Sequence, residues 1–552
     1  MQKNERLILT AVDYSEQGVA VCKHEGFVVF VKGMLVGEVA DVLIMRVNTR
    51  QAFGRLMEVI EPSKDRVEPR CPIAYQCGGC QLQHMSAEHQ AEFKQKHVTH
   101  LFDRQFATHP EVLPIISMED PWFYRNKSQV PFEVKEELEY GYYRAHSHTI
   151  LPFETCYIQN DESNQILKFI KDFYFEQSVK PVDLRHVLIK KAFATEQLMV
   201  ILVHKTKTLP LMNELTSALL TQFPKIKAIV LNVNKKEDNV VLGDKFIPLT
   251  LESTIEDRLG DFTFKISPSS FYQVNPVQAK VLYDHAVKFA QLKGTESVLD
   301  LYSGIGTISL FLAKQAKKVY GIEINPQAIE DAKANAELNK VSNVEFLVGD
   351  AKEAVRYFIE EKIHLDVILV DPPRKGLDKD TLDAIMTLSP DRLVYVSCDP
   401  STLVRDCKLL EDIYTVELIQ PVDMFAQTYH VETVCLLSKL HEAKHHVSVK
   451  LDMDELDLTA SESKATYEEI KKYVAEHYDG MKVTNLYIAQ VMRKCGIELA
   501  ENFNLPKWEG AKGLGDLCSE RTGVGTKTAK QPQCPKEKED AIVEALKHFK
   551  MI

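Results

Sequence analysis

Residues 1 to 61 alternate short apolar runs with glycines. The runs are rich in β-branched residues, which favour strands, and the glycines between them permit tight turns. The runs are Leu7–Asp13, Gly18–His24, Phe27–Phe30, Glu38–Val47 and Phe53–Ile60. Five short strands separated by glycine turns predict a small barrel or sandwich in this part of the chain.

The segment from residue 62 to residue 265 mixes helical and strand-like spacing. A long polar stretch from Ser86 to Asp103 has the spacing of a helix. Strand-like runs follow at His186–Phe193 and Gln197–His204, and a second pair is expected at Lys225–Asn234 and Val240–Leu242. This mixture predicts a central α+β domain.

From about residue 270 to Leu440 short apolar strands alternate with helical stretches. The strands are expected at Val298–Leu301, Lys318–Ile322, Val344–Val348, Val367–Val370 and Leu393–Val396. The helices are expected at Ile308–Ala316, Pro326–Asn339, Lys352–Lys362 and Lys379–Leu388. Such βαβ alternation predicts an α/β fold with a doubly wound, mostly parallel sheet.

The chain continues beyond this sheet with a polar, acidic stretch and then two stretches of helical spacing, Tyr467–Glu476 and Asn485–Cys495. We interpret them as a linker and a small helical extension, with RNA or partner binding as a hypothesis for the latter. The predicted divisions are 1–61 (barrel), 62–265 (central domain), 266–442 (doubly wound domain), 443–465 (acidic linker) and 466–552 (helical extension).

Composition narrows the class of protein. Hydrophobic residues make up 45% of the 552 residues and charged residues 26%, which is ordinary for a globular protein and excludes collagen, coiled-coil rods and full disorder. The net charge of −12 argues against coating nucleic acid by bulk charge. Eleven cysteines are too sparse for a disulfide scaffold, and the chain contains no apolar run long enough for a membrane span. We therefore expect a cytoplasmic protein with reduced thiols.

A glycine turn follows the first of the parallel strands and marks a candidate nucleotide-type site. Gly304 and Gly306 let the backbone approach a ligand closely. Asp300, Glu323 and Asp350 lie at or near the ends of three consecutive strands, and an acid such as Glu323 suits the two hydroxyls of a ribose. Together they favour S-adenosylmethionine, the alternative being that the acids are solvated helix N-caps.

The turn Asp371-Pro-Pro-Arg374 follows the strand Val367–Val370 directly. Proline restricts the backbone, so the turn holds its carboxylate and carbonyl groups rigidly over a site. Methyltransferases that modify the amino groups of bases often carry an aromatic residue after such a turn. Arg374 stands there instead, which indicates another chemistry on a base.

Cys398 follows the strand Leu393–Val396 and is a candidate nucleophile. We expect the helix that starts at Pro400 to lower its pKa. A thiolate that adds to C6 of uracil makes C5 nucleophilic, and a base must then remove the C5 proton. Glu432, at the start of a late strand expected at Val431–Leu436, and the nearby His430 offer such a base. The alternatives are a buried structural cysteine and a surface acid.

Four further cysteines form a possible metal site. Cys71, Cys77 and Cys80 have C-x5-C-x2-C spacing, and Cys156 follows much later. Thiolates bind zinc or an iron–sulfur cluster, and spacing alone does not separate these from each other or from unligated cysteines.

At this point the sequence resembles the RNA uracil-5 methyltransferases, over about residues 1 to 440. The matching motifs are Ser270-Phe-Tyr-Gln-Val-Asn275, Asp300-Leu-Tyr-Ser-Gly-Ile-Gly306, Asp371-Pro-Pro-Arg374, Ser397-Cys-Asp-Pro400 and His430-Val-Glu432. The resemblance implies a Rossmann-like class I methyltransferase domain in which Cys398 is the nucleophile and Glu432 the base. It implies that the S-adenosylmethionine contacts are Gln273, Tyr302, Glu323 and Asp371, with Thr307 and Asp350 matching less closely.

The resemblance also implies which branch of the family this is. The ribosomal-RNA branch carries an N-terminal TRAM domain, which is a five-stranded OB-type barrel, and a [4Fe-4S] cluster on four cysteines in this pattern. By that similarity Cys71, Cys77, Cys80 and Cys156 hold the cluster. The expected function is conversion of a uridine in 23S ribosomal RNA to 5-methyluridine by a monomer. The alternatives are a tRNA-directed uracil methyltransferase and a non-catalytic RNA-binding iron–sulfur protein.

Overall fold

The structure is a computed structural model, and it describes residues 1–145, 147–236, 238–440, 467–478, 481, 483, 485–494 and 536–548. The chain divides into two compact units, Met1–Lys444 and His445–Ile552. The predicted acidic linker, 443–465, lies outside the described residues, and the other predicted domain boundaries stay predictions. Each unit is described by itself.

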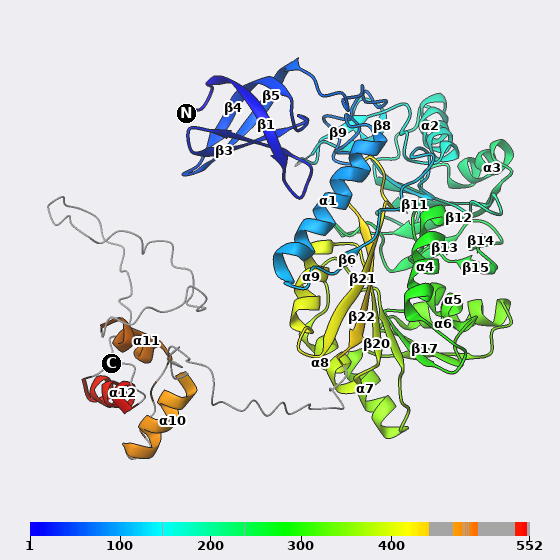
Figure 1. The fold of residues 1–552 in the computed structure, drawn as a ribbon. Coiled ribbons are helices and arrows are strands. Elements are labelled where there is room, and N and C mark those ends of the chain that lie inside the picture. The colour runs from blue at the N-terminus through cyan, green and yellow to red at the C-terminus, as the bar shows by residue number, and fades with distance from the viewer. Residues whose placement is uncertain are drawn as a thin grey trace. The chain divides into compact units, whose positions relative to one another are not determined.

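The N-terminal strands close into a barrel in the order β1-β2-β3-β5-β4 (Figure 1). They are β1 Arg6–Tyr14, β2 Ala20–His24, β3 Phe27–Lys32, β4 Val39–Val47 and β5 Gln51–Glu61. Their inward-facing residues, among them Leu9, Val29 and Ile44, are fully or almost fully buried. The alternation of buried and exposed positions along each strand explains why the pattern was visible in the sequence. The predicted five-stranded barrel is confirmed.

Helix α1, Ala87–Gln105, leads from the barrel into the rest of the unit. The central part contains a seven-stranded sheet in the order β13-β12-β11-β10-β7-β8-β9, with helices α2 and α3 packed against it. The elements are β7 Lys127–Val134, β8 Leu138–Tyr143, β9 Ile150–Pro152, α2 Asp161–Glu176, β10 Leu184–Lys191, β11 Leu198–His204, α3 Met212–Gln222, β12 Ile226–Val233 and β13 Lys245–Pro248.

One strand prediction in this sheet is wrong. Residues 240 to 242 form no strand, and the partner of β12 is β13, Lys245–Pro248. The short apolar run at Val240–Leu242 instead supplies backbone carbonyls of Val240 and Val241 that accept hydrogen bonds from the side-chain amide of Asn234. An apolar run of three residues is too short to separate a strand from a buried loop.

The remaining part of this unit is built on an eight-stranded sheet in the order β18-β17-β16-β19-β20-β22-β21-β6. Strands β16 to β20 are parallel, and β22 runs antiparallel to both of its neighbours. The strands are β6 Glu111–Val112, β16 Ser297–Leu301, β17 Lys318–Glu323, β18 Val344–Val348, β19 Val367–Val370, β20 Arg392–Ser397, β21 Tyr414–Val422 and β22 Glu432–Lys439. The predicted α/β fold with a mostly parallel sheet is confirmed.

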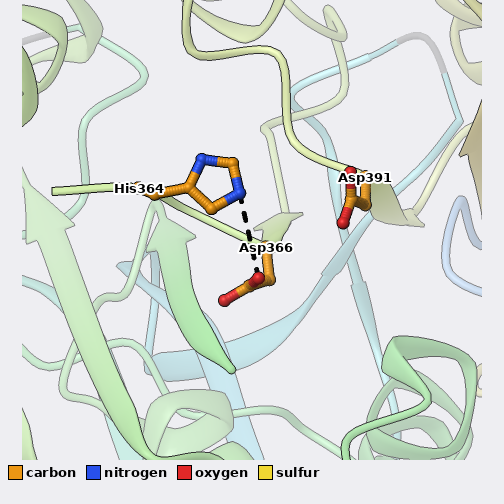
Figure 2. A group of neighbouring side chains, drawn as sticks. All are labelled: His364, Asp366 and Asp391. Atoms are coloured by element: carbon orange, nitrogen blue, oxygen red, sulfur yellow. Dashed lines mark ion pairs between the residues drawn. The ribbon is translucent and has the colours of Figure 1, made fainter. Parts of the chain in front are cut away.

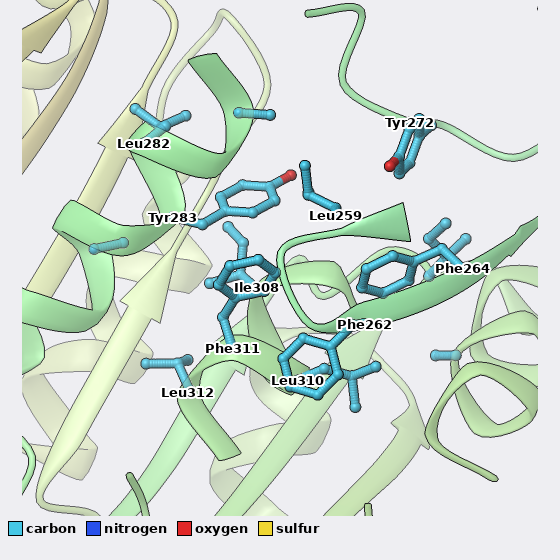
Figure 3. Close-up of a cluster of buried hydrophobic side chains, with 14 of the residues drawn as sticks. Leu259, Phe262, Phe264, Tyr272, Leu282, Tyr283, Ile308, Leu310, Phe311 and Leu312 are labelled. Carbon is cyan, nitrogen blue, oxygen red and sulfur yellow. The ribbon is translucent and has the colours of Figure 1, made fainter. Parts of the chain in front are cut away.

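Helices cover both faces of this sheet, as Figure 1 shows. Helices α4, α5 and α6 share one core with the sheet, and α1, α7, α8 and α9 share the other. Figure 3 shows the first core, to which the hairpin of β14 and β15 adds Leu259, Phe262 and Phe264. The remaining elements are β14 Ile255–Leu259, β15 Phe262–Ile266, α4 Pro276–Ala290, α5 Thr307–Ala313, α6 Pro326–Leu338, α7 Ala351–Glu360, α8 Lys379–Leu388 and α9 Pro400–Leu409. Because helices cover both faces, we expect ligands to bind this sheet at the ends of its strands.

The second unit contains helices α10 Tyr467–His477, α11 Asn485–Lys494 and α12 Lys536–His548. They share a small core that includes Ile470, Val474, Ile488, Ile542 and Leu546. The two predicted helices are confirmed, and α12 was not predicted.

Candidate active site

The glycine turn after β16 is shaped by two left-handed glycines. Gly306 has φ of 81°, and a Cβ there would lie 2.7 Å from Cζ of Phe346, so only glycine fits. Gly304 has φ of 55°, and no heavy atom lies within 4 Å of the position of its missing Cβ. The turn therefore leaves open space on the side of Gly304, at the carboxyl end of β16.

Acidic and polar side chains surround this open space. The Glu323 carboxylate accepts the backbone N–H of Gly304 at 3.3 Å and that of Asn325 at 2.9 Å. Asp300 is buried, and one of its oxygens accepts the Ser309 hydroxyl while the other has no partner. The buried hydroxyl of Ser303 is also without a partner. Buried polar groups without partners mark a place where a polar ligand would bind.

The other predicted cofactor residues are placed unequally. Tyr302 lies directly after β16 with φ of 72°, and its hydroxyl contacts Thr381 Oγ1 at 3.0 Å. Thr307 begins α5, and Gln273 is buried in the segment between β15 and α4. Asp350 is the exposed N-cap of α7, whose carboxylate accepts the N–H groups of the first helical turn. Helix capping accounts for the position of Asp350 without a ligand, which is the alternative given for these acids in the sequence analysis.

The candidate reacting groups gather at the carboxyl ends of β19 and β20. Asp371 follows β19, Cys398 follows β20, and Glu432 is the buried first residue of β22, which pairs with β20. Cys398 lines a cavity of about 210 Å³ together with Arg374 and His430. The barrel turn residues Glu16 and Gln17 and helix-α1 residue His97 line the same cavity. The barrel thus reaches the mouth of the site.

Burial raises the pKa values of all three groups, and repulsion by neighbouring carboxylates adds to the shifts of Glu432 and Cys398. Burial raises the pKa of Asp371 to about 7. Burial and the charge of Asp371 raise the pKa of Glu432 to about 8. Burial and both carboxylates raise the pKa of Cys398 to about 12, and Arg374 opposes the shift. The net shift is thus upward, because desolvation by burial is its largest cause, and the expected lowering by the start of α9 stays a prediction.

Arg374 connects these groups to His430. Its guanidinium lies 3.3 Å from Nε2 of His430, and burial together with Arg374 lowers the pKa of His430 to about 4. His430 is therefore neutral at neutral pH. This leaves Glu432 as the group of that segment that gains and loses a proton near neutrality.

Known proteins with similar sequences and structures agree with this architecture. The family model described as tRNA (uracil-5-)-methyltransferase matches residues 86–440. The chain belongs to the RNA uracil-5-methyltransferase family. It is an S-adenosylmethionine-dependent RNA methyltransferase, and RNA is its substrate.

The similar proteins cover most of the enzyme. It is 45% identical over 447 residues to an uncharacterized RNA methyltransferase of Halalkalibacterium halodurans, a match that spans 79% of this chain and 98% of the relative. It is 43% identical over 453 residues to one of Clostridium tetani, with 80% and 98% covered. Among solved structures, it matches the Pyrococcus abyssi tRNA (uracil-54, C5)-methyltransferase in complex with S-adenosyl-L-homocysteine, at 28% identity and a TM-score of 0.62. That match covers 78% of this chain and 99% of the other.

No local pattern in the sequence indicated the hydrogen-bond network that holds the segment before Glu432 in this methyltransferase. Lys94 of α1 is fully buried, and its ammonium donates to Asp423 at 2.6 Å and to the carbonyl of Phe425 at 3.1 Å. The side chain of Gln90 exchanges two hydrogen bonds with Gln427, at 3.0 and 3.1 Å. These partners lie more than 300 residues apart in the chain.

The four predicted metal-binding cysteines come together in the methyltransferase. Cys71, Cys77, Cys80 and Cys156 all line one cavity of about 330 Å³, and all four are free thiols. The backbone N–H of Gly79 points to Sγ of Cys77 at 3.3 Å. Buried polar atoms without partners line the same cavity, namely Nε of Arg125, the hydroxyl of Tyr142 and Oε1 of Gln159. Arg374 and His430 line it as well, so the cysteine cavity borders the active site.

A separate group of possible metal ligands lies at the opposite ends of the strands in this sheet. His364 and Asp366 precede β19, and Asp391 precedes β20 (Figure 2). His364 and Asp391 are exposed, and one oxygen of Asp366 already accepts the backbone N–H of Ser297 at 2.7 Å. This group is at the amino ends of the strands and is therefore remote from the methyltransferase site at the carboxyl ends.

Among the described residues, no helix is long and apolar enough to cross a membrane.

Proposed function

We propose that the enzyme methylates C5 of a uridine in 23S ribosomal RNA, with Cys398 as nucleophile and Glu432 as base. The observation that carries the chemistry is the convergence of Cys398, Asp371 and Glu432 at one edge of the sheet, where each carboxylate raises the pKa of the thiol. A surface cysteine and a surface acid would not interact in this way. The non-catalytic alternative has no use for such an arrangement.

We place S-adenosylmethionine at the glycine turn. Glu323 would accept the ribose hydroxyls, and Gln273, Tyr302 and Asp371 would line the site, with Thr307 and Asp350 at its margin. The residues fit this group, because Asp300 and Ser303 flank the turn with buried oxygen atoms that lack partners, and Gly304 of the turn has room beside it. When bound, the group supplies an electrophilic methyl carbon on a positively charged sulfonium.

Cys398 begins the reaction by releasing its thiol proton to solvent, which reaches the half-buried side chain, and by forming a bond from the resulting thiolate to C6 of the uracil ring. The electron pair of the C5–C6 double bond moves into the ring as an enolate, and C5 then takes the methyl carbon. A nearby positive charge favours the thiolate, and Arg374 provides one on the protein side. The uracil C5 now carries both a hydrogen and the methyl group.

Glu432 completes the reaction by accepting the C5 proton, after which the C6–sulfur bond breaks and the thiolate leaves. A carboxylate whose pKa is raised to about 8 is a stronger base than an exposed glutamate. Because it is buried, water does not compete for the proton. The products are 5-methyluridine, the demethylated donor and one proton.

We propose that Cys71, Cys77, Cys80 and Cys156 hold a [4Fe-4S] cluster. In a tetrahedral zinc site with Zn–S bonds of 2.3 Å the sulfurs would be about 3.8 Å apart. Among the described residues, no three of these cysteine sulfurs lie within 4.8 Å of one another. The ligand atoms that do lie so close together belong to His364, Asp366 and Asp391. The wider spacing suits a cluster, and the unpartnered Tyr142 and Arg125 donors face the same cavity.

We expect anaerobically purified enzyme to contain about four iron and four sulfide per chain, and replacing Cys80 with alanine to remove most of both. Metal analysis and acid-labile sulfide assays measure this. Cys407→Ala, at a buried cysteine of α9 outside the cavity, is the matched control and should keep its iron. Stoichiometric zinc without sulfide would contradict the cluster.

The ribosomal substrate is supported by the joint presence of the N-terminal barrel and the four cysteines. The family model begins at residue 86, after the barrel and three of these cysteines. Transfer RNA is the second candidate, because the structural neighbour from Pyrococcus abyssi is a tRNA (uracil-54, C5)-methyltransferase.

We expect cells that lack this enzyme to lose 5-methyluridine from 23S ribosomal RNA and to keep it in tRNA. Nucleoside mass spectrometry of the two purified RNA pools measures this, and restoring the gene should restore the modification. Loss from tRNA alone would assign the enzyme to the second candidate.

A further inference from the structure

An arginine surrounded by three aromatic rings lies beside the cysteine cavity. The guanidinium carbon of Arg70 is 4.7 Å from the ring centroid of Tyr157, 5.3 Å from that of Trp122 and 5.4 Å from that of Phe123. The rings of Trp122 and Phe123 lie 6.5 and 6.0 Å from that of Tyr157. We call these four residues the Arg70 cluster.

The Arg70 cluster is open to solvent. Arg70 is exposed, and the three rings are half-buried. Within the described part of the chain, no hydrogen bond or ion pair engages the Arg70 guanidinium. A charged group that packs only on ring faces keeps its donors and its outer plane free for another molecule.

The backbone fixes the rings in place. Phe123 has φ of 50°, a left-handed conformation that is costly for a bulky residue. The N–H of Phe123 donates to the carbonyl of Tyr157 at 2.8 Å, and the N–H of Arg125 donates to that of Ile158 at 3.0 Å. Two segments distant in sequence are thereby joined, and a strained residue held in this way is a common mark of a binding site.

The position of the cluster relates it to the reaction. Tyr157 lines the cysteine cavity together with Arg374 and His430, and these two residues also line the cavity of Cys398. A path of contiguous cavity walls therefore leads from the Arg70 cluster to the nucleophile. An RNA strand whose uridine enters the Cys398 cavity would bring a neighbouring nucleotide to this path.

We propose that Arg70, Trp122 and Tyr157 form a stacking site for an unpaired base of the RNA substrate that lies close to the target uridine. Proteins recognise single-stranded RNA by stacking bases on aromatic rings and guanidinium planes. Such a site needs no broad basic surface, which agrees with the net charge of −12. The inference rests on RNA as substrate and is independent of whether the RNA is ribosomal.

A purely structural role of the Arg70 cluster would have different experimental consequences. Arg70 precedes Cys71 and Tyr157 follows Cys156, so the same residues could simply cover the cysteine site. In that case their loss would change metal retention and would affect RNA binding only as far as metal is lost. The test therefore measures both properties on the same preparation.

The experiment measures binding of two probes to the anaerobically purified full-length enzyme. One probe is a single-stranded oligouridine of about twelve nucleotides, and the other is an abasic oligomer with the same phosphates. We expect Trp122→Ala to weaken binding of oligouridine about tenfold, to leave binding of the abasic oligomer unchanged and to keep the iron content of the wild type. Phe175→Ala, at an exposed aromatic residue of α2, is the matched control and should change neither.

Fluorescence gives a second measurement that needs no truncated side chain at the site. The chain has two tryptophans, so Trp508→Phe leaves Trp122 as the one reporter. Oligouridine should quench its emission, and the abasic oligomer should not. Unchanged emission with oligouridine, equal affinity of Trp122→Ala and wild type, or weaker binding that only follows iron loss would overturn the proposal.

Discussion

Replacing Cys398 with alanine is expected to reduce methyl transfer at least a thousandfold, with the fold and cofactor binding retained. The proposed route requires a covalent bond at C6 before C5 can react, and among the described residues no other thiol lines the cavity. The side chain is half-buried at a strand end, so its removal leaves a small space rather than a deep core cavity. Transfer of a radioactive methyl group to unmodified ribosomal RNA measures the rate.

The controls separate the chemistry from the structure. Cys435→Ala removes a fully buried thiol from β22, only three residues after Glu432, and should keep most of the activity. Binding of S-adenosylhomocysteine to Cys398→Ala, measured by calorimetry, should match the wild type. Activity above a tenth of the wild type in Cys398→Ala would rule out the covalent route.

The fold could be predicted where burial follows a simple period. Strands β16, β17, β19 and β20 are short apolar runs that are mostly buried on both faces. The edge strand β18 is only partly buried, and the predicted bounds of all five strands are right to within a residue. The barrel strands alternate, and they too were found. Strand β6 has two residues and joins the sheet by pairing with β21, so no local pattern could indicate it.

The types of residue in the candidate site could be predicted from the sequence, but the pKa shifts of these residues could not. Turn glycines and strand-end acids are local features, and they identified the cofactor side. The pKa of Cys398 is raised first by burial and then by Glu432 and Asp371, which belong to other strands or their ends. Likewise, the segment before Glu432 is fixed by Lys94 and Gln90 of α1, and sequence spacing contains no information on contacts across 300 residues.

Replacing Glu432 with glutamine is expected to trap a covalent protein–RNA adduct that already contains the new methyl group. The amide keeps the size of the side chain and cannot accept the C5 proton, so the C6–sulfur bond cannot break. Turnover should fall at least a hundredfold while the adduct accumulates to nearly one per active chain. A gel under denaturing conditions would resolve it, and a radioactive methyl label should move with the protein band.

The pKa of Glu432 gives this prediction its pH dependence. The carboxyl group has a pKa raised to about 8, so in the wild type the carboxylate fraction grows as pH rises through that value. Elimination from the methylated adduct should therefore accelerate between pH 7 and pH 9 in the wild type, whereas the glutamine variant should show no such increase. Glu417→Gln, at an exposed acid of the neighbouring strand β21, is the matched control and should turn over normally. If Glu432→Gln turned over at the wild-type rate, or bound RNA and methyl donor without forming an adduct, another group would have to remove the C5 proton.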